Sequence, residues 1–496
     1  MGFIKITEEL LNEAFTENGD KAYQTSGSYC LDFFALVGGM RFNVDDALNL
    51  FLRAYYEDKV LAIKILFFSR DIRGGLGERN IFRYILNALS NMCPDVARKI
   101  LSFVPEYGRY DDLFSALNTP LTKDVVKIIQ DQLKIDIEAK NSGKPVSLLA
   151  KWMPSINTSS NETKELATLL AKELGLTKEE YRKTLSSLRK GIIIENNLRE
   201  KDYSFDYAKI PGGASFKYKK AFFRNDKERY DTYLSLVNEG KAKINSGTLY
   251  PYQVIRELEN KVLSYTSRND GLTLEEIKSL DTIWNSFSKD SIDSKTIVVR
   301  DGSGSMFDYE AVSASSVATS LALLFAERLQ GEFHNKFITF SSSPKLVTVE
   351  GNNIYEKFKN TLKYSDVSNT NIEKVYNLIL DVYKSPSFKK EDALDRIVII
   401  SDMEFDVGVD CSKTTFESFK EKFNSLGFEL PQIVFWNVRA RNIHLPVTKN
   451  EHNVVLVSGA SSNIIDMVTN NTLTNPYDIM IETVSKYSFL DELGIQ

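Results

Sequence analysis

The residue pattern changes at Lys295, and this change constrains the fold more than any other feature of the chain. Before it, apolar residues recur at every third or fourth position, which is the spacing of amphipathic helices. After it, short β-branched runs alternate with helical stretches, the pattern of a doubly wound α/β sheet. We therefore predict a helical domain over residues 1–290 and an α/β domain over residues 291–496.

In the helical domain, short segments with helical periodicity are separated by turn signals such as Gly74-Gly75 and Asn141-Ser142-Gly143. Short helices at close spacing favour stacked antiparallel pairs, as in a HEAT-like helical-repeat array, and the lack of a strict period makes that array irregular. Residues 191–250 mix strand-like and loop-like pieces, and residues 252–288 return to a helical pattern. The predicted helices are Asp45–Tyr56, Lys59–Phe68, Ile81–Leu89, Val96–Val104, Val125–Ile137 and Glu165–Leu174.

In the α/β domain, five β-branched runs are predicted to form strands, with helices between them. A further run, Lys345–Val349, follows its predecessor across a short Ser-Pro turn, so we expect that one strand to be antiparallel in an otherwise parallel sheet. The predicted strands are Thr296–Val299, Phe337–Phe340, Ile397–Ile400, Ile433–Trp436 and Val454–Val457. The predicted helices are Glu310–Leu329, Ile372–Tyr383 and Phe416–Ser425.

The charge distribution supports the same boundary. Residues 1–290 hold 42 basic and 40 acidic side chains, whereas residues 291–496 hold 20 and 27. Cys30, Cys93 and Cys411 are too far apart for a CxxC metal site and too few for a disulfide framework, which favours a reducing compartment. The acidic N-terminus does not resemble a signal peptide, and the apolar runs are shorter than the roughly 20 residues of a membrane span. We therefore expect a cytoplasmic protein with no membrane contact.

Oxygen-bearing side chains follow the first predicted strand of the α/β domain directly, in Asp301-Gly302-Ser303-Gly304-Ser305. Open α/β sheets bind their ligands at the carboxyl ends of their strands. Asp301 supplies a carboxylate, and Ser303 and Ser305 supply hydroxyls. A hard divalent cation such as Mg²⁺ prefers these ligands and retains several waters, so few protein ligands are needed. The sequence therefore predicts a site for Mg²⁺, or for Mn²⁺ or Ca²⁺, at this loop.

Two later residues complete the predicted ligand set. Thr370 precedes the helix predicted at Ile372–Tyr383 and offers a hydroxyl, and Asp402 follows the strand Ile397–Ile400 and offers a carboxylate. Each also has a plainer interpretation, Thr370 as a helix N-cap and Asp402 as a carboxylate that stabilises a turn.

These three segments, DGSGSM, NTNIEKVYNLIL and IVIISDMEFD, resemble the metal-ion-dependent adhesion site (MIDAS) of a von Willebrand factor A domain, a Rossmann-like fold, over roughly residues 293–480. The stretches RDIRGGLGERNIFRYIL, VPEYGRYDDLF, LAKWMPS and YRKTLSSLRK resemble the helical half of the TROVE-like family, which occurs in bacteria, phages and eukaryotes and includes the Ro autoantigen. The resemblance implies a ring of helical repeats closed by an A domain, the binding of small non-coding RNA, and a protein partner that donates a carboxylate to the metal.

A basic and aromatic segment is the second candidate site. Residues 181–227 hold twelve basic and five acidic side chains, and seven aromatic residues lie between Tyr203 and Phe223. Basic groups neutralise phosphates and aromatic rings stack on unpaired bases, so the segment is compatible with small or single-stranded RNA. A solvated basic face above a buried aromatic cluster remains the alternative. The candidate RNA-binding residues are Arg189, Lys190, Lys217, Tyr218, Lys219, Lys220, Phe222 and Arg224.

The glycine- and arginine-rich stretch from Arg70 to Arg79 is not a P-loop, because it has no Gly-Lys-Ser/Thr end and follows a helix instead of a strand. One interpretation gives Arg73 and Arg79 a contact with phosphate. The other is a turn between helices in which glycines adopt positive φ and Arg70 and Asp71 pair across the helices.

No residue pattern indicates catalysis. The three histidines, His334, His444 and His452, lie in no nucleophile motif, and no general base accompanies the metal loop. We therefore expect a protein that is not an enzyme and has no small-molecule substrate. Two functions stay open: a ribonucleoprotein scaffold with a metal-dependent docking domain, or a purely protein-binding adaptor or structural component of an assembly such as a virion.

Overall fold

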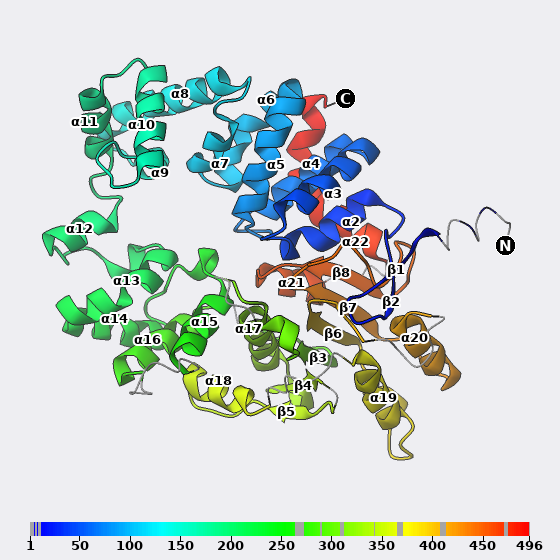
Figure 1. The fold of residues 1–496 in the computed structure, drawn as a ribbon. Coiled ribbons are helices and arrows are strands. Elements are labelled where there is room, and N and C mark those ends of the chain that lie inside the picture. The colour runs from blue at the N-terminus through cyan, green and yellow to red at the C-terminus, as the bar shows by residue number, and fades with distance from the viewer. Residues whose placement is uncertain are drawn as a thin grey trace.

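The computed structural model describes residues 11–262, 272–287, 290–307, 312–341, 343–364, 371–406, 413–470 and 475–495, together with Ile4 and Thr7. Over these residues a helical unit, α2 to α16, lies above and beside a sheet unit, β3 to α21 (Figure 1). In this part of the chain no helix is both long and apolar enough to cross a membrane.

The sheet unit is built on a six-stranded sheet in the order β5-β4-β3-β6-β7-β8, in which only β5 is antiparallel to its neighbour. The five predicted strands and the antiparallel sixth are confirmed. Every residue of β3 and β6 is buried, as in parallel sheets that helices cover on both faces. The strands are β3 (Thr296–Asp301), β4 (Lys336–Phe340), β5 (Leu346–Thr348), β6 (Arg396–Ser401), β7 (Gln432–Asn437) and β8 (Val454–Ser458).

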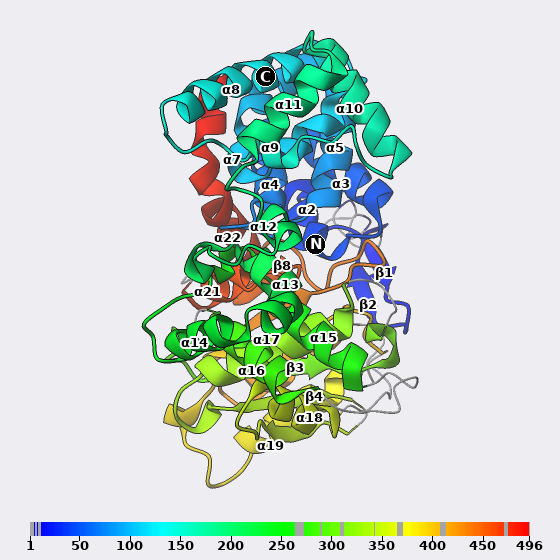
Figure 2. The ribbon, with the colours of Figure 1, turned by 90° about the vertical axis from the view of Figure 1, so that its left-hand side faces the viewer.

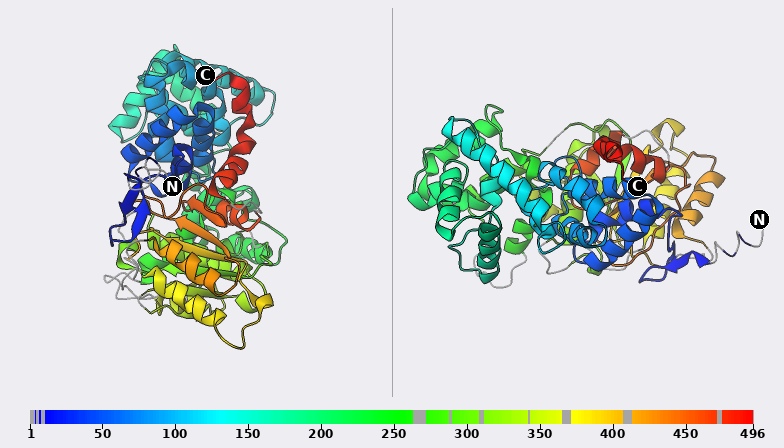
Figure 3. Two further views of the ribbon diagram at one scale, coloured as in Figure 1. Left: turned by 90° about the vertical axis from the view of Figure 1, so that its right-hand side faces the viewer. Right: turned by 90° about the horizontal axis from the view of Figure 1, so that it is seen from above.

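Helices cover both faces of this sheet. α17 (Ala314–Arg328) packs on β3 and β6, and α19 (Ile372–Tyr383) and α20 (Thr415–Ser425) lie on the opposite face (Figures 1 and 3). Nearly all of α17 is buried, because α15 of the helical unit packs along its outer side. α18 (Ile354–Leu362) and α21 (Asn463–Asn470) complete the unit.

The six predicted helices of the N-terminal part are confirmed, with the fourth broken into shorter turns after Ile100. The helices are α2 (Tyr29–Leu36), α3 (Val44–Glu57), α4 (Lys59–Arg70), α5 (Arg79–Met92), α6 (Pro94–Ile100), α7 (Val104–Tyr107), α8 (Thr122–Asn141), α9 (Leu149–Trp152), α10 (Asn161–Glu173), α11 (Lys178–Leu188), α15 (Pro251–Val262) and α16 (Leu274–Trp284).

Residues 191–250 are more helical than predicted. They form α12 (Ile194–Glu200), α13 (Gly212–Asn225) and α14 (Lys227–Asn238). The buried positions of α13 recur at helical spacing, but two of them are Ser215 and Lys219 instead of apolar residues. The expectation of strand-like pieces here was wrong because polar residues on the buried face hid the helical period.

The helical unit contacts the sheet unit at both of its ends. At one end the α2 region meets β8, where the amide of Gly38 donates to Ser458 Oγ at 2.9 Å. A Cβ on Gly38 would lie 2.5 Å from the carbonyl oxygen of Ser458, so this close approach requires glycine. At the other end α15 packs along α17. Between these contacts the chain runs out through α8 to α11 and back through α12 to α14 (Figures 1 and 2).

Each terminal segment of the chain packs on the unit that the opposite end of the chain forms. Near the N-terminus, β1 (Glu13–Phe15) and β2 (Lys21–Tyr23) form a hairpin that lies on the sheet unit. At the other end, α22 (Pro476–Val484) and η9 (Ser485–Leu493) pack on α2 and α4, and the ring of Phe489 contacts Phe67 (Figure 3). Each unit therefore also contains a segment from the opposite end of the chain.

Candidate metal centre

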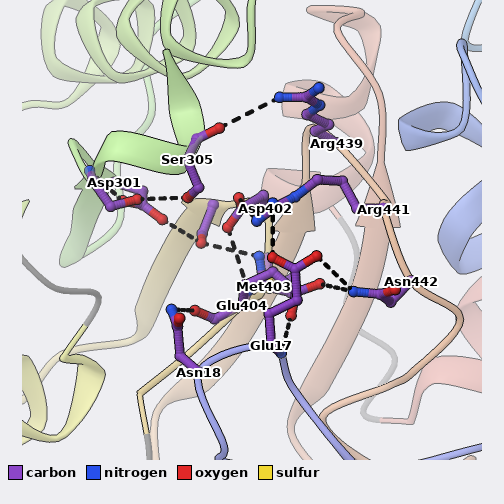
Figure 4. A network of polar contacts seen from close by, with 12 residues as sticks. Glu17, Asn18, Asp301, Ser305, Asp402, Met403, Glu404, Arg439, Arg441 and Asn442 are labelled. Atoms are coloured by element: carbon purple, nitrogen blue, oxygen red, sulfur yellow. Dashed lines mark hydrogen bonds and ion pairs between the residues drawn. The ribbon is translucent and has the colours of Figure 1, made fainter. Parts of the chain in front are cut away.

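The predicted metal loop lies at the carboxyl edge of the sheet. β3 and β6 are adjacent and parallel, and Arg300 pairs with Ile400 in register. Asp301 at the end of β3 and Asp402 just after β6 therefore reach the same edge. Ser303 and Ser305 follow Asp301 in a loop containing a short 3-10 turn, and the Ser305 side chain points toward the two aspartates (Figure 4).

Hydrogen bonds join the side chains of this edge. Asp301 accepts from the amide of Ser303 at 2.8 Å and from Ser401 Oγ at 2.5 Å. The hydroxyls of Ser303 and Ser305 are 3.0 Å apart, and Ser305 hydrogen-bonds to Asp402. The structure thus brings together four of the five predicted ligands. The fifth, Thr370, lies outside the described residues.

The electrostatics of the edge suit a cation. Asp301 and Asp402 are each only 1% exposed. Burial and the negative charge of Asp402 raise the pKa of Asp301, and burial raises the pKa of Asp402. Two buried carboxylates at close range are costly unless positive charge compensates them, and the guanidinium of Arg441, which pairs with Asp402, is shared with Glu17. Carboxylate and hydroxyl oxygens are ligands for Mg²⁺, Mn²⁺ or Ca²⁺, so the residues present fit the predicted cation.

The site depends on hydroxyl ligands. Within the described residues, no group of three or more histidine, cysteine, aspartate or glutamate side chains is placed to hold a metal ion. A cation bound by Asp301 and Asp402 would therefore need Ser303 and Ser305, with waters in its remaining positions.

The sequence analysis missed the residues that surround Asp402 on its other side. Arg441 places one guanidinium nitrogen 2.9 Å from Asp402 and another 2.7 Å from Glu17 of the N-terminal hairpin. Arg439 donates to the backbone carbonyl of Ser305 at 3.4 Å (Figure 4). One signal for the two arginines was present, because they lie in the segment just after the predicted strand Ile433–Trp436 and so near the same edge. Nothing in the pattern pointed to Glu17.

A buried acid–histidine pair lies beside the metal loop. Glu404 is 1% exposed, and its Oε1 lies 3.1 Å from His444 Nε2. Burial opposes ionisation of Glu404, but the hydrogen bond and charge of His444 outweigh it and hold the pKa of Glu404 below its usual value. The amide of Glu17 and the side chain of Asn442 also donate to Glu404. These contacts tie the loop after β6 to the hairpin.

The basic and aromatic segment has a different arrangement. Phe222 is fully buried, with its ring 5.2 Å from those of Tyr207 and Tyr230. Lys219 is 5% exposed and lies 2.6 Å from Glu257. The prediction that these two side chains contact RNA is therefore corrected, because neither is accessible to a base or a phosphate.

The other candidates of this segment divide into paired and exposed side chains. Arg189 donates to the carbonyl oxygens of Ala150 and Met153 and to Ser155. Tyr218 donates to Glu195 at 2.7 Å, and Lys220 lies 3.0 Å from Glu276. Lys190, Lys217 and Arg224 are exposed.

The glycine- and arginine-rich loop joins α4 to α5. Arg70 is buried and lies 2.7 Å from Asp112, and Asp71 accepts from the Tyr487 hydroxyl at 3.0 Å. Of the loop's glycines, Gly77 has a positive φ of 72°, and a Cβ on Gly75 would lie 2.1 Å from the Phe68 carbonyl oxygen. These contacts favour the interpretation of a turn between helices.

The two arginines predicted to contact phosphate differ in their surroundings. Arg73 donates to the carbonyl oxygen of Glu106 at 3.2 Å. Arg79 is exposed at the first position of α5. Burial and the nearby guanidinium groups of Arg109 and Arg83 lower the pKa of Arg79. The two neighbouring guanidinium groups are themselves paired with Asp111 and Asp112, which offset part of their charge at Arg79.

Comparisons with known proteins cover nearly the whole chain. A family model described as a domain of unknown function, DUF7788, matches residues 295–486, and another, DUF2828, matches residues 16–102 and 111–296. An uncharacterized protein of Acanthamoeba polyphaga mimivirus is 31% identical over 522 residues, which cover 96% of this chain and 88% of that protein.

A solved structure was also found. The crystal structure of the Deinococcus radiodurans Ro (RSR) protein matches at 12% identity over 91% of this chain and 92% of its own, with a TM-score of 0.35, which is too low to carry an argument about fold. The matched DUF2828 segments span more than half of the chain, and the mimivirus relative spans almost all of it. The chain therefore belongs to the DUF2828 family.

Proposed function

We propose that the chain is a non-enzymatic scaffold whose sheet unit is a von Willebrand A-like domain that docks an acidic protein partner through a divalent cation. The observation that carries the proposal is the meeting of Asp301 and Asp402 with two serine hydroxyls at one edge of the sheet. Both carboxylates are buried, and burial raises the pKa of each; a bound cation would stabilise their charged forms.

Asp301, Ser303, Ser305 and Asp402 would hold Mg²⁺, Mn²⁺ or Ca²⁺, and Thr370 remains a proposed fifth ligand. When bound, the cation supplies an open coordination position to a carboxylate of the partner. Glu404 and His444, the titratable pair beside Asp402, are buried and hydrogen-bond to each other. This arrangement fits a structural role and does not fit a general base, which must reach the proton that it abstracts.

The helical unit is proposed to be an irregular TROVE-like repeat array that holds the docking domain between its two ends. Two contacts support this arrangement, that of α2 with β8 and that of α15 with α17. The second contact supports an array that lies close to the proposed docking site, because α17 follows the metal loop in the chain.

Two measurements on the full chain test the proposal. Calorimetric titration measures Mg²⁺ binding, and fluorescence anisotropy measures the binding of a labelled polyglutamate peptide in Mg²⁺ or in EDTA. The wild-type chain should bind the cation and should retain the peptide only in Mg²⁺. Asp301→Ala should lose Mg²⁺ binding and peptide binding. Asp381→Asn, at an exposed carboxylate on α19, should retain both kinds of binding. Equal peptide binding by wild type and Asp301→Ala would contradict the proposal.

A second candidate function is binding of single-stranded RNA by the helical unit. The concentration of guanidinium groups around Arg79 favours it, together with the exposure of Lys190, Lys217 and Arg224. Phosphate contacts of this kind weaken steeply as the salt concentration rises. A mobility shift of a labelled single-stranded RNA that disappears in Arg79→Ala would support this function. An unchanged shift in that variant would remove Arg79 from it.

A further inference from the structure

The N-terminal hairpin lies on the rim of the candidate metal centre. Thr16 Oγ1 donates to the carbonyl oxygen of Phe405 at 2.6 Å, and Asn18 Nδ2 donates to that of Glu404 at 2.7 Å. Tyr23 and Leu445 exchange two backbone hydrogen bonds, each 2.9 Å long. The N-terminal hairpin thus holds the segment that follows β6 and carries Asp402.

The hairpin presents a carboxylate to the centre. Glu17 lies 2.7 Å from one guanidinium nitrogen of Arg441, and Asn442 Nδ2 donates to it at 3.1 Å. The same Arg441 lies 2.9 Å from Asp402 (Figure 4). The Glu17 side chain is 44% exposed, whereas that of Asp402 is fully buried. A carboxylate in the turn of the hairpin is therefore bound at the solvent side of the metal ligand set.

We infer that Arg441 and Asn442 form a carboxylate-binding subsite beside the metal centre, that Glu17 occupies this subsite, and that an acidic strand of a protein partner binds there by displacing the hairpin. The inference rests on the proposed docking function, because it names the chemistry of the partner and the contact that the partner replaces. Arg441 recognises the carboxylate by charge, and the exposed Asn442 adds a directional hydrogen bond.

The hairpin is suited to displacement. It has only three paired positions of its own, so its place depends on its contacts with the sheet unit, and a partner that replaces those contacts can release it. Its backbone attachment consists of two isolated bridges, Tyr23 with Leu445 and Gly19 with Asp406, and any extended peptide can form such backbone bonds. A competing strand can therefore reproduce these bonds with its own backbone.

The packing beneath the hairpin also leaves one hydrogen bond unmade. A small cavity lies between the hairpin and the sheet unit, lined by Asp20, Tyr376 and Met403 among others. The buried hydroxyl of Tyr376 has no hydrogen-bond partner within the described part of the chain. A buried hydroxyl without a partner lowers the stability of the contact that encloses it.

Full-length variants test the inference with one probe, a fluorescein-labelled peptide of residues 11–26, followed by anisotropy. Glu17→Gln should bind the peptide about threefold more tightly than wild type. The substitution removes the partly exposed ion pair between Glu17 and Arg441, so the chain's own hairpin competes less well with the peptide. Glu13→Gln is the matched control, because Glu13 is in the same hairpin but pairs with Lys21, and it should bind as wild type does. Amide exchange over residues 13–23 should be faster in Glu17→Gln alone.

The subsite itself is tested in the Glu17→Gln background. Adding Arg441→Gln should abolish peptide binding, but this change also strips Asp402 of its partner, so Asn442→Ala serves as the second probe. It should weaken peptide binding about threefold, the effect of one lost hydrogen bond to the peptide, and it leaves the Arg441–Asp402 ion pair in place. Because Asn442 also donates to Glu404, Mg²⁺ binding by this variant is measured alongside and should equal that of the Glu17→Gln parent. If neither Glu17→Gln nor Asn442→Ala changes peptide affinity or amide exchange, the inference is wrong.

Repeating the titration in EDTA separates the subsite from the metal. Weaker peptide binding in EDTA supports both the subsite and the proposed docking function. Equal binding in Mg²⁺ and EDTA, with the effects of Glu17→Gln and Asn442→Ala intact, supports the subsite and contradicts the metal-dependent docking.

Discussion

The metal edge and the basic aromatic segment make an informative comparison, because both stand out in the sequence as dense groups of functional side chains. At the edge, Asp301, Ser303 and Asp402 come within one hydrogen-bonded cluster. In the segment, Lys219 pairs with Glu257 and Phe222 is packed between tyrosines. Parallel strands deliver their following loops to one edge, whereas a helix distributes neighbouring side chains around its circumference. Density in a strand-end loop therefore predicts convergence better than density in a helical segment.

The largest expected effect is on stability, and it tests whether the basic aromatic segment belongs to the buried core. Phe222→Ala removes a fully buried ring from an aromatic cluster, so it should lower the free energy of unfolding by about 3–5 kcal/mol, measured by urea denaturation. Lys217→Ala, on the same helix but exposed, should change it by less than about 0.5 kcal/mol. Similar small effects in both variants would mean that the ring is not part of the core and would break the comparison.

The second effect tests the edge as a cation site. Mg²⁺ at about one hundred times its dissociation constant should stabilise the wild-type chain by about 2.7 kcal/mol, because a ligand that binds only the folded state shifts the unfolding equilibrium. Asp301→Asn should lose this gain, since it removes the carboxylate from the centre of the ligand set. Thermal unfolding with and without Mg²⁺ measures the stabilisation of the wild-type chain and of the Asp301→Asn variant. A gain that survives the substitution would place the cation elsewhere.

A smaller effect concerns the exposed cations of the segment. Combined replacement of Lys190, Lys217 and Arg224 with alanine should reduce the slope of log affinity against log salt for single-stranded RNA by about 0.7 for each phosphate that these side chains neutralise. Mobility shifts over a range of salt concentrations measure this slope. A slope identical to that of wild type would show that the segment binds no phosphate and would sharpen the contrast with the metal edge.

The smallest effect tests whether the paired charges of the segment are merely structural. Lys220 lies 3.0 Å from Glu276 but is 57% exposed, so Lys220→Ala should cost at most about 1 kcal/mol of stability, in line with surface ion pairs. Urea denaturation detects the change. A loss several times larger would mean that the pair organises the segment.

The sheet could be predicted from sequence because its determinants are local. The runs at Thr296–Val299 and Ile397–Ile400 are β-branched and buried on both faces, and they became β3 and β6. Their adjacency brings Asp301 and Asp402 to one edge. The plainer interpretation of Asp402 also holds in part, because Asp402 accepts from the amide of Glu404 at 3.3 Å. A turn carboxylate can therefore face a cation site at the same time.

The remaining features depend on contacts that no local pattern encodes. Glu17 reaches Arg441 across more than four hundred residues, and Phe489 completes the aromatic packing around Phe67 from the far end of the chain. The helix α13 escaped prediction because Lys219 occupies a buried position, where it is paired with Glu257. In each case a distant partner makes the local choice favourable, so the choice cannot be recognised in a short window of sequence.

The most direct test of the central claim is electron paramagnetic resonance of the full chain titrated with Mn²⁺, which counts bound cations without any partner. The account predicts a single bound Mn²⁺ in the wild-type chain, displaced by excess Mg²⁺, and its loss in both Asp301→Asn and Asp402→Asn. Unchanged Mn²⁺ binding in these two variants, or no binding by the wild-type chain, would contradict it.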